Sequence, residues 1–513
     1  MRVSTLIGAS LSCAYAFVIP QTFLDAFQLP SAIDEQSFWP HKPYFLKHQV
    51  NPESFPEDIT LAELNSTAWD LYQIASTSNR TYGHPTRVIG SEGHWNTLNY
   101  IFRQFDQMRD YYEISTQTFK ALNGKVLHYD LNYTSGAKVP SAQAFSLSPP
   151  VAPFVGKLVE VPNLGCSEAD YQALEVKGDS IALIERGECS FGKKSDLAGK
   201  HGFKAVVIYD NDPKSKKGVS GTLEKPTNNT VSTIGVSYVV GQELVLGITL
   251  DPDFSLYYFM DSYVNEIETK NIIADTKHGD PENIVSLGAH TDSVAAGPGI
   301  NDDGSGTISL LAVAKHLSDY KVNNKVRFAF WAAEEEGLVG STYYAENLSP
   351  EENLKIRLFM DYDMMASPNY QYQVYNANNI DNPKGSEELR DLYIDYYTER
   401  GLNYTLIPFD GRSDYVGFIE NGIPGGGIAA GAEDVNTDNG NVFDKCYHEL
   451  CDDVSNLNWD AFLTNTQLIA YSVAHFADSL EDFPERDTNE TVSTFGVGYN
   501  YPYAYKGGAN LLL

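Results

Sequence analysis

The feature that most constrains the fold is the alternation of short apolar runs with helical patterns after Asn271. Short apolar runs are typical of buried strands, and apolar residues at helical spacing are typical of helices that pack on a sheet. Predicted strands span residues 284–289, 326–333, 356–360, 372–375 and 423–430, and predicted helices span residues 306–320, 338–348, 387–400 and 459–480. This order predicts an α/β fold in which a mixed, largely parallel sheet lies between layers of helices. Ligands of such sheets bind beyond the carboxyl ends of the strands.

Residues from about 128 to 265 follow a different pattern, in which helical spacing is scarce. The β-rich runs there alternate with Pro, Gly and Ser and predict strands at residues 157–161, 181–185, 205–209 and 236–240. With 513 residues, the chain is long enough for two or three domains of about 150 residues each. We predict a β-rich module at residues 131–265, inserted into a larger domain formed by residues 56–130 and 266–490, with a C-terminal tail at 491–513.

Two helices are predicted before this insert. Thr60 and Glu63 form a capping box that starts a helix through about Ser76. Apolar residues at helical spacing after Ser91 indicate a second, amphipathic helix.

The N-terminus reads as an export signal. Arg2 precedes a short apolar run, and Ala14-Tyr15-Ala16 fits an A-x-A cleavage site, so residues 1–16 are a predicted signal peptide. A buried N-terminal helix is the alternative. Residues 17–55 are a predicted arm or propeptide. No other stretch reaches the roughly 18 apolar residues that a membrane span needs. We expect a secreted, soluble monomer, with the vacuole as the alternative location.

The cysteines and the sequons agree with export. Cys13 lies in the predicted signal, and proximity favours disulfides Cys166–Cys189 and Cys446–Cys451 among the pairings of the other four. A zinc site built from these four cysteines is the alternative, although their spacing lacks paired C-x-x-C knuckles. The predicted glycosylation sequons begin at Asn65, Asn79, Asn132, Asn228, Asn347, Asn403 and Asn489.

The charge balance bears on partners. The chain has 36 Lys and Arg against 68 Asp and Glu, which gives a formal net charge of −32. Nucleic-acid binding needs clustered Lys and Arg, and the sequence offers no such cluster. The composition therefore argues against nucleic acid as a partner.

Metal-binding residue types follow the predicted strands. Each alone is a common loop residue, but two His and several carboxylates without thiolate together suit a pair of Zn²⁺ ions, one carboxylate bridging them. Water between two such ions titrates near neutral pH and supplies a hydroxide nucleophile. The candidate residues are His290 and Asp292, Asp302 in a glycine-rich turn, the triplet Glu334, Glu335 and Glu336, Asp363, and His448 between two cysteines.

The same segments resemble a known family. Residues 288–293, 299–306, 332–338, 361–368, 411–415 and 446–448 are similar, in order, to motifs of the co-catalytic zinc aminopeptidases of metallopeptidase family 28. Residues 165–171, 181–187, 189–191 and 205–209 resemble the protease-associated (PA) domain. The likeness runs from about residue 60 to 485 and is greatest to fungal secreted and vacuolar members that carry a PA insert.

The resemblance implies two Zn²⁺ ions per chain. Asp302 would bridge the two ions. His290 and Asp363 would complete one site, and Glu335 and His448 would complete the other.

The resemblance also implies catalytic roles. Glu334 would be the general base that activates the metal-bound water, and Asp292 would accept the proton on the far ring nitrogen of His290. Glu336 and Asp303 lie outside the ligand positions of the motif.

The implied activity is removal of the N-terminal residue, such as Leu or another apolar residue, from peptides with a free N-terminus. The substrate ammonium would lie near the zinc that His290 binds. Tyr447 and the 411–415 loop are candidates for the pocket wall, and a salt bridge from Arg412 to Asp414 or Asp410 is an equally good interpretation of that arginine.

Two other functions fit parts of the pattern. A receptor ectodomain can keep this fold after its zinc ligands are lost, but here they are intact. Glutaminyl cyclases share the sheet and most ligands, but the insert and the Asn-Asp-Asp-Gly-Ser-Gly turn fit peptidases better. The PA module could restrict large substrates, contact a partner or cover the active-site rim.

Overall fold

The structure is a computed structural model that describes residues 43–486 except 215, 220, 224 and 225. The predicted signal peptide, most of the predicted arm, the tail at 491–513 and the sequon at Asn489 lie outside the described residues. The strands are β1 (His48–Gln49), β2 (Tyr112–Tyr133), β3 (Gln143–Ala144), β4 (Val151–Glu160), β5 (Ser180–Glu185), β6 (Ala205–Tyr209), β7 (Ser232–Val236), β8 (Ser255–Thr276), β9 (Asp280–His290), β10 (Tyr320–Lys321), β11 (Asn324–Trp331), β12 (Ile356–Tyr362), β13 (Tyr372–Tyr375), β14 (Tyr404–Ile407) and β15 (Gly425–Ala429). The α-helices are α2 (Leu61–Ala75), α3 (Asn79–Tyr82), α4 (Glu92–Gln107), α5 (Ala169–Gln172), α6 (Phe191–Lys200), α7 (Tyr238–Leu250), α8 (Gly304–Leu317), α9 (Val339–Glu346), α10 (Pro350–Lys355), α11 (Ser386–Glu399), α12 (Tyr415–Glu420) and α13 (Trp459–Asp478).

All the described strands except β1 and β10, which pair with each other, form one large sheet in the order β14-β13-β15-β12-β9-β11-β8-β4-β5-β6-β7-β3, with β2 paired to β8. The four strands β15, β12, β9 and β11 run parallel, whereas β8 is antiparallel to β11 and β13 is antiparallel to β15. The mixed, largely parallel sheet of the sequence prediction is confirmed. Because β9, β11 and β12 are parallel neighbours, their carboxyl ends lie at the same edge.

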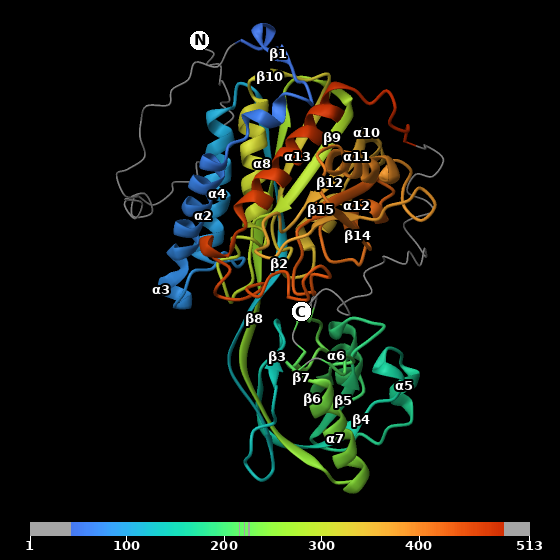
Figure 1. Ribbon diagram of the computed structural model, residues 1–513. Helices are drawn as coiled ribbons and strands as arrows, with labels where there is room; N and C mark the ends of the chain where they lie inside the picture. Colours follow the sequence, from blue (N-terminus) through green and yellow to red (C-terminus); the bar gives the residue numbers. More distant parts are fainter. Residues whose placement is uncertain (1–42, 215, 220, 224–225, 487–513) are drawn as a thin grey trace, which may run out of the picture. The chain divides into compact units, whose positions relative to one another are not determined.

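Helices cover both faces of the parallel strands, as the labels of Figure 1 show. Alternate strand residues such as Leu287, Phe328 and Met360 belong to a core shared with α2, α4, α8, α11 and α13. Trp331 and Phe359 face the other way, into a core shared with α9 and α12. This alternation follows from the period of two in a strand, and strands buried on both faces read as continuous apolar runs.

Strands β2 and β8 join the two parts of the chain. They pair antiparallel from Tyr112↔Thr276 to Tyr133↔Leu256. At one end β8 pairs with β11, and at the other it pairs with β4 of the β-rich module (Figure 1). The predicted module limits at residues 131 and 265 therefore fall inside continuous strands.

The β-rich module contains more helix than the sequence pattern predicted. Helix α6 follows β5, and α7 follows β7. The strand predicted at 236–240 is wrong, because the strand ends at Val236 and the helix begins at Tyr238. A short apolar run cannot tell a buried strand from a buried helix, and α7 is apolar along most of its length.

The predicted helices at the N-terminal side are confirmed. Thr60 and Glu63 form the reciprocal capping box of α2, and the Ser91 hydroxyl accepts the His94 N–H at the start of α4. Among the elements of the peptidase part that were not predicted are β14 and the six-residue helices α10 and α12.

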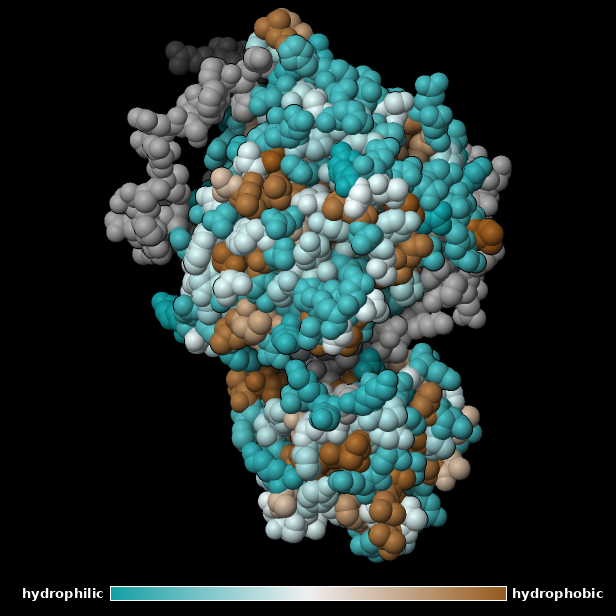
Figure 2. Space-filling model, in the orientation of Figure 1, coloured by the Kyte–Doolittle hydropathy of each residue, from teal (hydrophilic) through white to brown (hydrophobic). Residues whose placement is uncertain are grey.

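The surface facing the viewer in Figure 2 is mostly hydrophilic, with hydrophobic residues in small separate areas. Within the described part of the chain, no helix has the length and apolar character needed to cross a membrane.

Candidate metal centre

Strand ends and loops carry the predicted site residues to one edge of the sheet. His290 is the last residue of β9, and Asp302 lies in the turn that leads into α8. The glutamate triplet follows β11 after Trp331, and Asp363 comes directly after β12. Three parallel strands therefore deliver their following residues to the same place.

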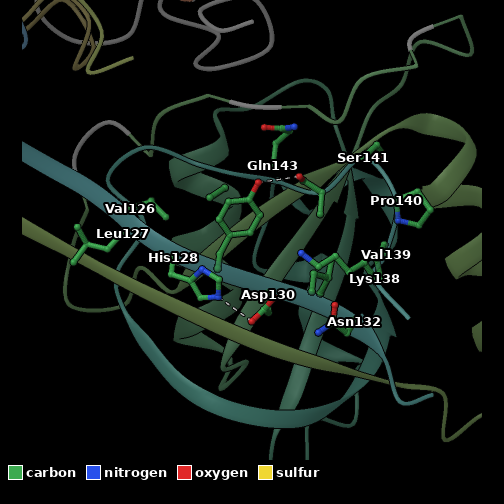
Figure 3. A pocket seen from close by; sticks show the side chains of 14 residues that line it. Val126, Leu127, His128, Asp130, Asn132, Lys138, Val139, Pro140, Ser141 and Gln143 are labelled. Carbon is green, nitrogen blue, oxygen red and sulfur yellow. Dashed lines mark hydrogen bonds and ion pairs between the residues drawn. The ribbon is translucent and has the colours of Figure 1, made fainter. Parts of the chain in front are cut away.

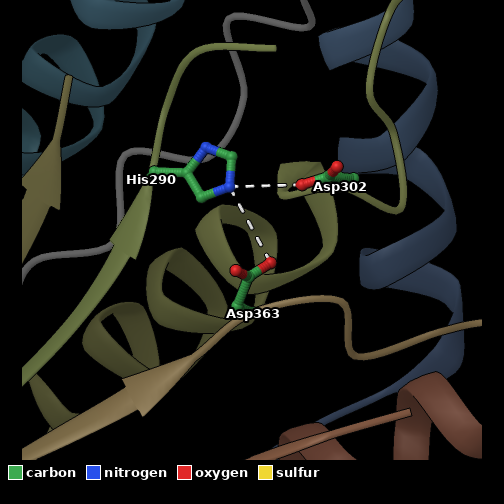
Figure 4. A group of neighbouring side chains, drawn as sticks. All are labelled: His290, Asp302 and Asp363. Atoms are coloured by element: carbon green, nitrogen blue, oxygen red, sulfur yellow. Dashed lines mark ion pairs between the residues drawn. The ribbon is translucent and has the colours of Figure 1, made fainter. Parts of the chain in front are cut away.

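The first ligand group consists of His290, Asp302 and Asp363, whose ligand atoms lie within 4.8 Å of one another. Figure 4 shows the two carboxylates directed at the same ring nitrogen. Nε2 of His290 lies 3.2 Å from Oδ1 of Asp302 and 3.8 Å from Oδ1 of Asp363.

The second ligand group consists of Asp302, Glu335 and His448. Nε2 of His448 lies 3.1 Å from Oδ2 of Asp302 and 3.2 Å from Oε2 of Glu335. Asp302 thus belongs to both groups and presents a different oxygen to each. The structure brings together all five residues that the family resemblance implies as ligands.

The donor atoms of these groups fit metal ions. Both ring nitrogens of His290, Oδ2 of Asp302 and Oδ1 of Asp363 are buried without a hydrogen-bond partner. Buried polar atoms are normally satisfied, so lone pairs left without a hydrogen-bond donor call for another electron-pair acceptor, such as a metal ion. Imidazole nitrogen and carboxylate oxygen are ligands of Zn²⁺, and a carboxylate with two free oxygens can join two ions.

The buried carboxylates at this edge of the sheet also favour the binding of cations. Burial raises the pKa of Asp363 to about 7, and the charges of Asp302 and Asp361 add to this against the opposing charge of His290. Burial likewise raises the pKa of Glu335. Burial lowers the pKa of His290, but nearby carboxylates, Glu334 foremost, outweigh it and raise that pKa well above its usual value. The edge therefore holds more buried negative charge than its imidazoles neutralise.

The glutamate triplet is divided by the turn after β11. Glu335 belongs to the second ligand group, whereas Glu334 and Glu336 belong to neither group. Glu334 is 6 % exposed, and its Oε2 lies 3.8 Å from Nε2 of His290. Ala333 has a φ of 62°, a conformation that is rare outside glycine and is found at functional turns.

Asp292 lies beside His290 but bonds elsewhere. Its Oδ1 is 3.8 Å from Nδ1 of His290, too long for the hydrogen bond that the resemblance implied. Its two oxygens instead accept the backbone N–H groups of Glu334 and Glu335, both at 3.3 Å. Asp292 therefore orients the glutamate turn in this structure.

Further buried acids hold the ligand loops. Asp303 accepts the N–H groups of His290 at 3.1 Å and of Met364 at 3.2 Å, which leaves it outside both ligand groups. Asp452 accepts the N–H of Asp302 at 3.1 Å. Asp452 was not among the predicted site residues, and its position directly after Cys451 was the available signal.

The predicted disulfides are both confirmed, and the alternative of a zinc site built from four cysteines is excluded. Cys166–Cys189 lies in the β-rich module, and Cys446–Cys451 brackets His448.

Arg412 forms the predicted ion pair with Asp410, but it binds an unpredicted partner more closely. Its fork binds Glu433 at 2.8 Å through both nitrogens, while Asp410 is 4.0 Å away. Glu433 lies 21 residues beyond Arg412, too far for a local sequence pattern to predict the pairing.

A small cavity of about 20 Å³ adjoins the second ligand group, enough for one water molecule. It is lined by Thr222, Glu334, Glu335, Gly337, Arg412, Tyr447 and His448. A larger pocket of about 760 Å³ is lined by residues 126–132 and 138–144 (Figure 3). It contains none of the predicted metal or catalytic residues.

The sequons differ in exposure. Asn79, Asn228, Asn347 and Asn403 are exposed, whereas Asn65 and Asn132 are half-buried. Asn132 also lines the larger pocket (Figure 3).

A helix-covered mixed sheet with two adjoining imidazole and carboxylate groups at its carboxyl edge is the arrangement of a metal-dependent hydrolase. Comparison with known proteins defines it further. Residues 271–473 match the family described as Peptidase family M28, and residues 154–244 match the PA domain.

The chain belongs to peptidase family M28 and is an aminopeptidase of that family. It is 60 % identical to aminopeptidase Y of Saccharomyces cerevisiae, over 96 % of this chain and 94 % of that protein. It is 38 % identical to leucine aminopeptidase 2 of Arthroderma otae, over 87 % of this chain and 89 % of that protein. Among solved structures, an aminopeptidase from Aneurinibacillus sp. strain AM-1 superposes with a TM-score of 0.70 at 26 % identity, covering 85 % of this chain and 98 % of that one.

Proposed function

We propose that this chain is a two-zinc aminopeptidase that removes an N-terminal residue, with Leu or another apolar residue preferred. The observation that carries the proposal is the position of Asp302, which offers one carboxylate oxygen to each of two ligand groups. The relative named leucine aminopeptidase 2, at 38 % identity, supports the preference for Leu.

The proposed ligand sets follow the two groups. His290 and Asp363 would hold one ion, Glu335 and His448 the other, and Asp302 both. When bound, two Zn²⁺ ions act as Lewis acids that polarise the scissile carbonyl and lower the pKa of a shared water. The protein supplies the fixed positions of its five ligands and a site with little access to solvent.

Glu334 is the proposed general base and acid. It lies beside the first group without belonging to it, and it lines the cavity that has room for one water. Burial, with the charges of Glu335 and others, raises the pKa of Glu334 well above its usual value, although His290 opposes this. A carboxylate so placed can accept the proton of the attacking water and then deliver it to the leaving amine.

Recognition of the free N-terminus follows from charge. The excess of buried carboxylates at this edge would attract the substrate ammonium, which an internal peptide bond lacks. This charge favours removal of single N-terminal residues over internal cleavage.

We also propose that the protein is exported, to the medium or to the vacuole, and glycosylated. Two disulfides are typical of an oxidising compartment, and four sequons lie on exposed asparagines. A mass decrease on treatment with an endoglycosidase is expected for protein purified from its natural source, and an unchanged mass would contradict it.

The direct test combines metal quantitation with a peptide-ladder assay by mass spectrometry. We expect two zinc ions per chain and sequential loss of single residues from the N-terminus of a Leu-rich peptide. Activity on a Leu-arylamide that survives complete metal removal would overturn the proposal. An assay for cyclisation of an N-terminal Gln peptide, run in parallel, should be negative.

A further inference from the structure

Arg87 is a fully buried cation beneath the metal centre, at 0 % exposure. It lies between α3 and α4, more than two hundred residues before the ligands it approaches. Its Nε donates to the carbonyl of Pro298 at 2.9 Å, its Nη1 to that of Thr291 at 2.5 Å, and its Nη2 to that of Gly299. Within the described chain, all of these side-chain hydrogen bonds go to backbone carbonyls.

The carbonyls that bind Arg87 belong to the two segments that carry the first ligands. Thr291 directly follows His290, and Pro298 and Gly299 open the turn that contains Asp302. The turn packs tightly on the guanidinium, because a Cβ added to Gly299 would meet Nη2 of Arg87 at 3.2 Å. Arg87 therefore ties together the segments on both sides of the centre.

The main chain around Arg87 holds the same region. Its backbone N–H donates to Oγ of Ser293 at 2.9 Å, and the Thr86 hydroxyl donates to the Val294 carbonyl at 3.0 Å. These two hydrogen bonds fix the backbone at Arg87 next to the turns that its guanidinium binds.

The charge of Arg87 acts on buried acids without pairing with one of them. The carboxylates whose charges it feels are those of Asp292, Asp303, Asp452 and Asp302. Arg186, which is also buried, instead pairs directly with a carboxylate, that of Asp210 at 3.3 Å. A cation shared among several acids offsets their mutual repulsion rather than neutralising one of them.

We propose that Arg87 is a positioning residue of the metal centre, an internal counter-cation that keeps the turns of His290 and Asp302 in place while the centre holds no metal. The proposal rests on the metal centre proposed above. Metal ions bring positive charge of their own, which offsets the carboxylates and repels the guanidinium. The charge of Arg87 is therefore worth more to the metal-free protein than to the metal-loaded one.

The test is thermal unfolding of the full chain with excess zinc and with excess chelator, at one pH and one heating rate. Arg87→Met removes the charge and keeps much of the volume. We expect it to lower the Tm of the metal-free protein by several degrees more than that of the metal-loaded protein. Arg87→Lys keeps the charge and should leave the gap between the two Tm values close to that of the wild type.

Arg357→Met is the matched control. Arg357 is also buried, at 4 % exposure, and donates to backbone carbonyls, those of Phe483 and Pro484, in a different part of the fold, where it also pairs with the exposed Glu485 at 3.4 Å. Its loss should lower both Tm values alike, because it faces no metal ligand.

An equal drop in both Tm values for Arg87→Met would overturn the proposal and leave Arg87 a packing residue. If Arg87→Met does not accumulate as folded protein, Arg87→Lys decides, since a gap that differs from the wild type would contradict a role of the charge. If the chain does not bind metal at this centre, the result is different, because chelator then leaves the Tm of the wild type unchanged.

Discussion

The PA module and the metal edge of the peptidase part both bury ionisable side chains, but they satisfy them in different ways. In the PA module, Arg186 pairs with Asp210 at 3.3 Å, and Lys194 donates to the carbonyls of Leu164 and Gly187. At the metal edge, ring and carboxylate atoms of His290, Asp302 and Asp363 are buried without hydrogen-bond partners.

The difference separates structural charge from functional charge. A buried ion that finds its partner in the chain stabilises or tolerates the fold, whereas a surplus of buried carboxylates is costly until another cation binds. Both regions are equally enclosed by protein, so burial alone does not mark the site. The site is marked by the clustering of several ring nitrogens and carboxylate oxygens that lack partners.

The largest expected effect comes from Glu334. Glu334→Gln keeps the shape of the side chain but cannot accept a proton, so kcat should fall by about 10²- to 10⁴-fold while the metal content stays at the wild-type value. Glu336→Gln is the matched control, since Glu336 is a buried neighbour outside both ligand groups, and it should cause a far smaller loss. Ordinary turnover by Glu334→Gln would remove the assigned role.

The shared ligand can be distinguished from an unshared one by metal content. Asp302→Asn should cost both ions, because each group loses an oxygen from the same carboxylate, whereas Asp363→Asn should leave the second group intact with close to one ion. Metal analysis after dialysis measures both. If the two variants retain the same amount of metal, Asp302 does not bridge.

The two disulfides allow the regions to be compared directly. Cys446→Ser with Cys451→Ser should loosen the loop of His448 and weaken the hold on one ion. Cys166→Ser with Cys189→Ser alters only the PA module and should leave metal content unchanged. Chelator competition measures both, and equal metal retention by the two double variants would contradict the link between this loop and the centre.

The smallest effect concerns a paired acid away from the metal edge. Burial raises the pKa of Glu63, but hydrogen bonds from His316 and Thr60 and the charges of His316 and Lys315 outweigh it and bring that pKa to about 2. A carboxyl group whose pKa is lower in the folded than in the unfolded protein stabilises the fold at pH values above its unfolded pKa, here near 4.5. This contribution is lost as the pH falls toward 2.

Glu63→Gln should therefore remove about 1 kcal/mol of stability at neutral pH and flatten the decline between about pH 4.5 and pH 2. Denaturant unfolding at a series of acidic pH values measures both. An unchanged slope on the acid side would show that Glu63 is not a stabilising partner between α2 and α8.

The sequence predicted those parts of the centre that depend on local order along the chain. His290 and Asp363 follow apolar runs, and parallel strands carry such residues to one edge, so their meeting could be expected. The glycines and acidic residues of the segment from Asp302 to Gly306 indicated a metal-binding turn. Spacing also sufficed for the two disulfides.

What the sequence missed depends on contacts between distant segments. Arg87 reaches Pro298 and Gly299, and Arg412 binds Glu433, by hydrogen bonds that no local pattern encodes. The strand predicted at 236–240 failed for another reason, since an apolar run is equally compatible with the helix that begins at Tyr238.

The most direct measurement is anomalous scattering at the zinc absorption edge from crystals of the protein as isolated. The account predicts two peaks about 3.5–4 Å apart, one on each side of the Asp302 carboxylate. The first peak should lie beside His290 and Asp363 and the second beside Glu335 and His448, as the two ligand groups require. A single peak, or peaks away from Asp302, would contradict it.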